Sequence, residues 1–577
     1  MDKNMKKINN IIVLMLSVVL FASCQNVLDK EPLTEFTNGN FWTSETNVEM
    51  FANYFYNEWV GYGNGTSTNG LFYWQTLNDN QISSGFQNWY SVTVDASNGT
   101  WNNSYTEIRR ANFLVEKVPG IESMDAAAKN HWIGIGRLYR AWYHYILVRS
   151  FGDCVWVDHV LDVTEQDRNG YIFAARTDRD VVMDNVLEDL NFAVANIREN
   201  SSRTAMNRAV AQAIKAEICL YEGTFCKYRN SADGQKAPDA SRAQKFLNEC
   251  KSACEAIINN SNYQLGSSYR ATYNSIDLSG NKEMIMYKKY AFENSFCHSL
   301  IDYTCSSTMQ SGMSKAAFDA YLFRDGQCLA NTSLDKNDHA TFTPSGSTWV
   351  ADLSAVLATR DPRLAEAIDA NLMYNGTPYQ RYGVGHLTTS SSGYGVLKFD
   401  NEAIPVAYRP EGGKNYTDAP IFWLAEILLD HAEACAELGE NASALASINK
   451  LRTRVGMPNL TASPAADPAN NMGVSNLIWE VRRERRVEMM YDKNDRYWSL
   501  IRWHQLDKLD TGKYPDIAKG AWVGNHLTPT STAKADSKGY IDMTGKGTRT
   551  YEAKHYLRPI PSGQLDLNPN LNQNPGW

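Results

Sequence analysis

The sequence predicts a mostly α-helical fold whose scaffold is made of helical hairpins. Apolar residues recur every three or four positions over several long segments, which is the period of an amphipathic helix. Two such segments near the C-terminus are joined by so short a connection that they must lie antiparallel. Between the helical parts, residues 261–420 are rich in Ser, Gly, Asn and Tyr, which favours long irregular loop insertions with a few short strands.

The composition limits the classes of partner. The chain has 577 residues, of which 43% are hydrophobic and 21% charged, so it can bury a sizeable core. Its formal net charge is −8, and it has no long basic run. Binding to a nucleic-acid backbone requires clustered Lys and Arg, so we expect no nucleic-acid partner.

The N-terminus predicts export. Three lysines precede an apolar run from Ile11 to Ala22. As a helix this run would be about 18 Å long, too short for a bilayer core of about 30 Å. We therefore interpret residues 1–23 as a signal peptide. The small residues before Cys24 resemble the bacterial lipobox, which implies that this cysteine is lipidated and tethers residues 24–577 to a membrane. The alternative is an ordinary signal peptide followed by an unmodified cysteine.

Helical spacing defines the first part of the scaffold, which we place at about residues 24–260. Apolar residues at helical period predict helices over 132–148, 178–197 and 242–258. Asn207 is a favourable N-cap for a further helix rich in Ala. Small side chains at helical spacing allow a neighbouring helix to approach closely.

The second part of the scaffold covers about residues 421–577. A predicted helix over 421–438 ends at Gly439, which can adopt the left-handed C-cap conformation. Asn441 then caps a predicted second helix that Gly456 closes. The length and the Ala-rich faces of this pair resemble a tetratricopeptide hairpin. Another helix is predicted over 476–491.

Several stretches resemble the SusD/RagB family of outer-membrane nutrient-binding lipoproteins of Bacteroidetes. The resemblance rests on the segment that starts at Cys24, on Gly136–Tyr145 with Phe151-Gly152, on the hairpin from Ile421 to Arg454, on Glu484–Glu488 with Asp495–Trp503, and on Tyr556–Trp577. It implies a single domain of tetratricopeptide-like hairpins with an irregular binding half. It also implies no catalysis and no cofactor, and a location on the cell exterior. The implied role is capture of oligosaccharide or polysaccharide for a SusC-like TonB-dependent outer-membrane transporter.

A glycan site requires aromatic planes for the C–H faces of sugar rings and polar side chains for the hydroxyls. Residues 72–103 and the middle insertions combine these residue types. The ligand-binding candidates are Trp74, Asp79, Asn80, Trp89, Tyr90, Tyr290, Tyr303 and Trp349. For each aromatic residue the alternative is a place in the core.

Other motifs indicate structure rather than chemistry. The arginines at 482–486 alternate with glutamates, so we interpret the segment as a helix face whose charges compensate one another. The sequence contains no HExxH and no CxxC, and we predict no metal site. Nine cysteines remain besides Cys24, so they cannot all pair, and Cys250 and Cys254 are expected to share a buried helix face.

Three other functions stay open at this stage. A relative that captures peptides would use the same helical scaffold. A glycoside hydrolase would need two carboxylates whose separation in space the sequence does not reveal. A purely structural surface protein would bind neither kind of ligand.

Overall fold

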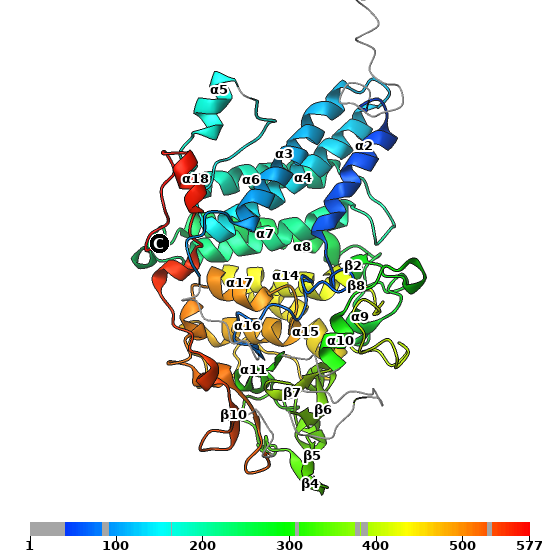
Figure 1. Ribbon diagram of the computed structural model, residues 1–577, viewed down its shortest axis with the longest axis vertical. Coiled ribbons are helices and arrows are strands. Elements are labelled where there is room, and N and C mark those ends of the chain that lie inside the picture. The colour runs from blue at the N-terminus through cyan, green and yellow to red at the C-terminus, as the bar shows by residue number, and fades with distance from the viewer. Residues whose placement is uncertain are drawn as a thin grey trace, which may run out of the picture.

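The computed structural model describes residues 41–83, 92–162, 164–305, 311–374, 381, 390–527 and 534–577. It confirms the predicted mostly α-helical fold with few short strands. The long helices lie across the upper and middle parts of the molecule, and most of the short strands gather at its lower end (Figure 1). The Cys24, Trp89 and Tyr90 predictions lie outside the described residues.

The upper layers consist of consecutive long helices, and all but the first of them pack on the next along the chain (Figure 1). Their bounds are α2 Glu45–Ala52, α3 Gly99–Lys117, α4 Ala126–Phe151, α6 Arg179–Asn196, α7 Arg208–Tyr228 and α8 Ala240–Ile258. Local signals fix the ends: the Asn207 side chain accepts a hydrogen bond from the Val210 amide, and α4 ends at Gly152 with φ of 76°. A Cβ atom on Gly136 would lie 2.8 Å from Val115 Cγ2, so glycine permits the close packing of α3 on α4.

The C-terminal hairpin continues this stack. Helix α14 (Leu424–Leu438) packs on α8, on α15 (Asn441–Arg454) and on α16 (Asn476–Glu488). Gly439 ends α14 in the left-handed conformation, with φ of 82°, as predicted. The predicted first turn of this helix is instead strand β8 (Ala419–Trp423), which pairs antiparallel with β2 (Met284–Lys288). The predicted cap also differs, because Asn441 is already helical and Glu440 occupies the cap position without a side-chain hydrogen bond.

The middle region contributes short elements. A four-stranded antiparallel sheet has the order β4-β5-β6-β7, and separate two-stranded pairs join β1 to β3 and β9 to β10. The strand bounds are β1 Gln81–Ser83, β3 Ser311–Met313, β4 Thr341–Ser345, β5 Thr348–Asp352, β6 Ile368–Met373, β7 Gly393–Val396, β9 Lys519–Trp522 and β10 Tyr540–Asp542. The short helices are α5 Glu165–Asp167, α9 Ala271–Asn274, α10 Leu300–Cys305, α11 Lys315–Ala320, α12 Ser354–Ala358, α13 Pro362–Ala367, α17 Asp495–Arg502 and α18 Ser562–Leu567.

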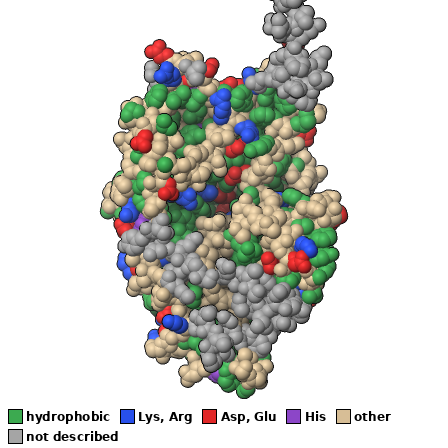
Figure 2. All heavy atoms as spheres, viewed as in Figure 1, with side chains coloured by type: hydrophobic (Ala, Val, Ile, Leu, Met, Phe, Trp, Pro, Cys, Tyr) green, Lys and Arg blue, Asp and Glu red, His purple; other side chains and the backbone are tan. Residues whose placement is uncertain are grey.

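Charged side chains are scattered over the face of the molecule drawn in Figure 2, whereas helix α16 is largely buried despite its high charge. Arg485 contacts Asp430 and Glu433 of α14 and Asp495 of α17, while Arg483 contacts Glu480 within its own helix. The interpretation as a helix face that compensates its own charges is therefore wrong for most of these residues. Most of the carboxylates that pair with these arginines belong to neighbouring elements. A buried charge is costly unless it is paired, and the nearest carboxylates lie on those elements.

The C-terminal tail packs against the helical layers. Tyr556 and Ile560 are buried, and the Asn574 side chain donates to the carbonyl oxygens of Phe151 and Arg558. The Trp577 indole donates to two backbone carbonyls of the same tail. This extended segment therefore gains the hydrogen bonds that its lack of regular structure would otherwise leave unmade.

Candidate functional site

The segment that precedes β1 places two of the predicted ligand-binding residues. The Asn78 side chain accepts hydrogen bonds from the backbone amides of Asn80 and Gln81, which folds the chain into a tight turn. Ser314 fixes this turn from the other side, because its hydroxyl donates to the Asp79 carbonyl and its amide to the Asn80 carbonyl. Antiparallel pairing of Gln81 with Met313 then continues as the β1-β3 pair. Asp79 and Asn80 are thus held rigidly.

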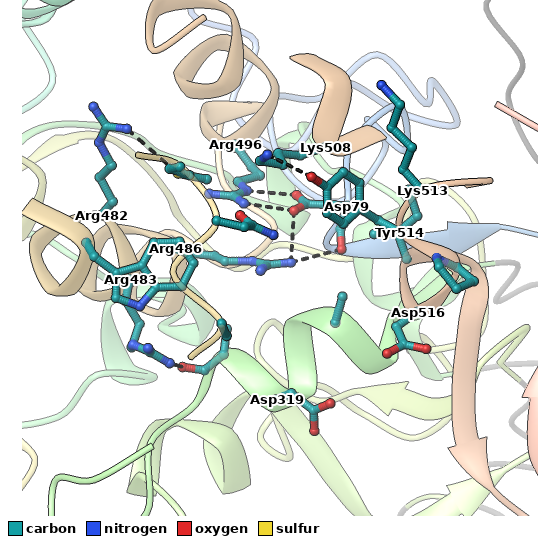
Figure 3. A pocket seen from close by; sticks show the side chains of 18 residues that line it. Asp79, Asp319, Arg482, Arg483, Arg486, Arg496, Lys508, Lys513, Tyr514 and Asp516 are labelled. Carbon is teal, nitrogen blue, oxygen red and sulfur yellow. Dashed lines mark hydrogen bonds and ion pairs between the residues drawn. The ribbon is translucent and has the colours of Figure 1, made fainter. Parts of the chain in front are cut away.

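Asp79 faces a pocket of about 350 Å³, which we call the arginine pocket (Figure 3). Its walls come from the turn before β1, from α11, α16 and α17, and from the segment 508–517. The lining residues that carry charge or an aromatic ring are Asp79, Asp319, Trp479, Arg482, Arg483, Arg486, Arg496, Lys508, Lys513, Tyr514 and Asp516. A volume of this size is within the range of small-ligand sites.

Two arginines share the carboxylate at the floor of this pocket. Arg496 donates to both oxygens of Asp79 at 2.7 and 2.8 Å, and Arg486 Nη2 lies 3.2 Å from Oδ2 (Figure 3). Although burial raises the pKa of Asp79, the two guanidinium groups outweigh it and hold that pKa well below its usual range. Arg486 also donates from Nε to the Asn80 side chain at 2.7 Å. Burial lowers the pKa of Arg486 to about 10, and it stays protonated at neutral pH.

Aromatic rings flank this charged floor. The Trp479 indole donates to Asp467 at 3.2 Å and the Lys508 ammonium donates to the Tyr514 hydroxyl at 2.8 Å, so both rings have fixed positions. Both are half-buried and line the pocket. Flat rings beside charged donors are what a sugar requires, because its C–H faces stack on rings and its oxygens accept hydrogen bonds.

Trp74 and Tyr303 form a second feature of the predicted site. Their rings meet edge to face with centroids 4.5 Å apart, and both side chains are half-buried. The Tyr73 hydroxyl, which contacts the Tyr303 carbonyl and the Ser311 backbone, ties the two segments together. The structure therefore brings these two candidates together, although they do not line the arginine pocket.

Tyr290 lies in the core, which corrects its prediction as a ligand-binding residue. The sequence offered it as a ligand-binding ring, but it is 2% exposed and its hydroxyl donates to the Gly63 carbonyl at 2.6 Å. Phe296 stacks on its ring with centroids 5.2 Å apart. The ring is a core element that anchors the loop around Gly63, and a ligand cannot reach its faces.

Trp349 lies far from the other candidates along the fold, in β5 near the lower end of Figure 1. It is half-buried and meets the His526 ring edge to face at 4.6 Å. Phe342 stacks on the same histidine ring with centroids 3.9 Å apart. Trp349 is thus part of a small aromatic cluster and is not joined to the arginine pocket.

The comparisons with known proteins agree over nearly the whole chain. The family profile described as the SusD family matches residues 254–577, and the profile described as starch-binding associating with outer membrane matches residues 5–220. The chain belongs to the SusD family. A SusD-like protein of Bacteroides ovatus is 21% identical over 98% of both chains. SusD-like protein P38 of Formosa agariphila is 21% identical over 86% of this chain and 92% of its own.

Solved SusD-like structures share the fold. A SusD-like carbohydrate-binding protein of Bacteroides fragilis superposes with a TM-score of 0.67 at 21% identity, covering 92% of this chain and 100% of its own. A laminarin-binding SusD-like protein gives a TM-score of 0.54 at 18% identity, covering 93% and 100%. Within the described residues, no helix combines the length and the apolar character needed to cross a bilayer.

Sequence reasoning missed several residues of the arginine pocket. Arg486 and Arg496 lie in the two motifs used to identify the SusD family, and we assigned those motifs to the scaffold alone. Trp479 and Tyr514 come from segments to which no binding role was given. The only available signal was the number of arginines in one short helix, because the partners that turn some of them toward a pocket are remote in sequence.

One cluster of this SusD-family chain has the ligand types of a metal site. A carboxylate oxygen from each of Asp180 and Glu222 and the sulfur of Cys226 lie within 4.8 Å of one another. Arg179 and Arg229 already donate to these carboxylates, at 2.5 and 2.8 Å respectively. Guanidinium groups therefore occupy the place of a cation, and we assign no metal to this cluster.

Proposed function

We propose that this protein captures oligosaccharide or polysaccharide at the cell surface without cleaving it. The observation that carries the proposal is the arginine pocket, in which Trp479 and Tyr514 flank the Asp79, Arg486 and Arg496 floor. Membership of the SusD family supports a carbohydrate ligand, since a solved relative is described as carbohydrate-binding and another as laminarin-binding. Stacking faces and rigid polar donors supply the two kinds of contact that sugars form.

A paired substitution tests this use of the pocket. Tyr514→Ala removes one flanking ring and should weaken saccharide binding about two- to tenfold, the usual worth of one aromatic contact. Tyr54→Ala is the control, because Tyr54 is 48% exposed and lies outside the pocket. Isothermal titration of the mature chain with a panel of polysaccharides measures both. Equal affinities of the two variants would refute a binding role for the pocket.

The same panel, extended by a pool of peptides, separates the rival functions. Binding only to members of a peptide pool would indicate a peptide-capturing relative. Sustained release of shortened saccharides, detected by chromatography, would indicate a hydrolase. No ligand in either screen would favour a structural role.

The proposal includes an anchor and a partner. An acylated Cys24 would hold the chain on the outer membrane, facing outward, where it would deliver ligand to a SusC-like TonB-dependent transporter. Retention beside the transporter mouth raises local ligand concentration without high intrinsic affinity. Mass spectrometry of the N-terminal peptide and co-purification of a β-barrel transporter test these two elements. An unmodified Cys24 in membrane fractions would refute the anchor.

A further inference from the structure

The arginines of α16 differ in how fully their charges are matched. Arg485 contacts three carboxylates and Arg483 contacts two. Among the residues that the structure describes, Arg486 contacts only the Asp79 carboxylate, which already makes a two-pronged pair with Arg496. Two cations on one carboxylate leave one positive charge at the floor of the arginine pocket.

The unmatched charge is directed into the pocket. Arg486 uses Nε on Asn80 and Nη2 on Asp79, whereas its Nη1 has no hydrogen-bond partner among the described residues. Its side chain is 13% exposed and lines the cavity (Figure 3). A desolvated guanidinium whose Nη1 has no partner can bind an anionic oxygen strongly. Hydrogen bonds between charged groups are stronger than hydrogen bonds between neutral groups.

The acidic residues of the pocket lie on a different wall from this excess charge. Asp319 and Asp516 lie on the side opposite Arg496 and Lys508 (Figure 3). Each of these aspartates lies near a lysine that a second aspartate shares: Lys315 is 2.5 Å from Asp319 and 3.1 Å from Asp338. Lys519 is 3.6 Å from Asp516 and 3.0 Å from Asp536.

The rim adds a further positive charge. Lys513 is exposed, lines the pocket, and makes no ion pair with any described residue. The arginine pocket thus has a basic floor and a basic rim position, and each aspartate of its acidic wall lies near a lysine. Such a charge distribution attracts an anion from solution.

We propose that the arginine pocket selects saccharides that carry an anionic group, a uronate carboxylate or a sulfate ester, and binds that group at Arg486. This inference rests on the proposed glycan binding and names the chemical class of the ligand. The sugar ring next to the anionic group would stack on Trp479 or Tyr514. Arg486 is thereby a specificity-determining residue, and Lys513 a steering charge.

Matched ligand pairs test the proposal. The mature chain is titrated with an oligogalacturonate and its carboxyl-reduced form, and with a sulfated galactan oligosaccharide and its desulfated form. We expect at least one anionic member to bind about tenfold or more tightly than its neutral counterpart, and to weaken as salt rises. The pair that shows the difference tells carboxylate from sulfate.

Two variants assign the effect to named groups. Arg486→Lys keeps a positive charge near Asp79 but lacks the second terminal nitrogen of the guanidinium, which would bind the anionic group. This variant should therefore lose most of the preference for the anionic member of each pair. Lys513→Gln, at an exposed position that folding tolerates, should weaken the anionic member about two- to threefold. Lys450→Gln, at an exposed lysine of α15, is the matched control and should change neither ligand.

The outcomes are distinct. Equal affinity for charged and neutral members, in wild type and in both variants, would overturn the selection of anionic saccharides while leaving glycan capture intact. A preference that survives Arg486→Lys and Lys513→Gln would overturn the assignment to this pocket. Failure of every saccharide, charged or neutral, would refute the proposed function itself.

Discussion

Replacing Glu433 by Gln should destabilise the fold more than any surface charge change. Glu433 is 1% exposed and accepts hydrogen bonds from Arg485 Nε at 3.0 Å, Arg502 Nη2 at 2.8 Å and Trp503 Nε1 at 2.6 Å. An amide retains the shape but removes the negative charge that these two cations share. Breaking a buried ion pair from one side costs about 3–5 kcal/mol, because the remaining charge stays desolvated.

The pKa of Glu433 gives an independent magnitude. Burial raises this pKa, but Arg502 and Arg485 outweigh it and lower it from 4.5 to about 2. A shift of this size corresponds to about 3 kcal/mol of stabilisation. Because the folded-state pKa lies below the unfolded one, this stabilisation is present above pH 4.5 and is lost as the pH falls toward 2. The wild type should therefore lose about 3 kcal/mol more than Glu433→Gln over that range.

Urea denaturation followed by circular dichroism measures both effects. Glu440→Gln is the matched control, because Glu440 pairs with Lys251 at 2.6 Å near the surface. A surface ion pair contributes about 0–1 kcal/mol to the free energy of unfolding. If Glu433→Gln and Glu440→Gln lower the free energy of unfolding at pH 7 by the same amount, the buried network does not stabilise the fold in the way argued. A wild-type pH profile that parallels that of Glu433→Gln would contradict the assigned titration.

Three further outcomes follow from the packing. Asp79→Asn should lower the free energy of unfolding by about 3 kcal/mol in urea, since it leaves two buried arginines without their carboxylate; a change under about 0.5 kcal/mol would contradict their pairing. Gly312→Ala should unfold at clearly lower temperature than Gly120→Ala by calorimetry, because a Cβ on Gly312 would lie 2.0 Å from Ser390 Oγ whereas one on Gly120 meets nothing within 4 Å; equal melting temperatures would contradict this. The nine described cysteines are buried, so a thiol reagent should react slowly with the native chain and rapidly after denaturation, and fast native labelling would contradict that burial.

The helices could be predicted because their signals are local. The Asn207 side chain bonds an amide three residues later, and Gly439 ends α14 through its own backbone conformation. Such contacts leave a pattern within one window of sequence. Residues Ile421–Trp423 could not be assigned in this way, because they form a strand only through pairing with β2, well over a hundred residues earlier.

The site could be predicted only in part, for the same reason. Asp79 and Asn80 became candidates because polar residues follow aromatic ones in a single segment. Whether a ring is exposed depends on remote residues: the Gly63 carbonyl and Phe296 bury Tyr290, and nothing near Tyr290 in the sequence indicates this. The place of Arg486 in the pocket could not be predicted, because it depends on contact with Asp79, about four hundred residues earlier.

Helix α16 connects the stability of the fold to the geometry of the arginine pocket. Successive residues of an α-helix project about 100° apart, so Arg485 and Arg486 face different neighbours. Arg485 is held by carboxylates of α14 and α17, which fixes the rotation and position of the whole helix. Because Arg486 belongs to the same helix, its backbone position is fixed as well, and its Nη1 faces the pocket. Binding of the proposed anionic group there would cost little conformational entropy of the protein, since the buried network already fixes the arginine without a ligand.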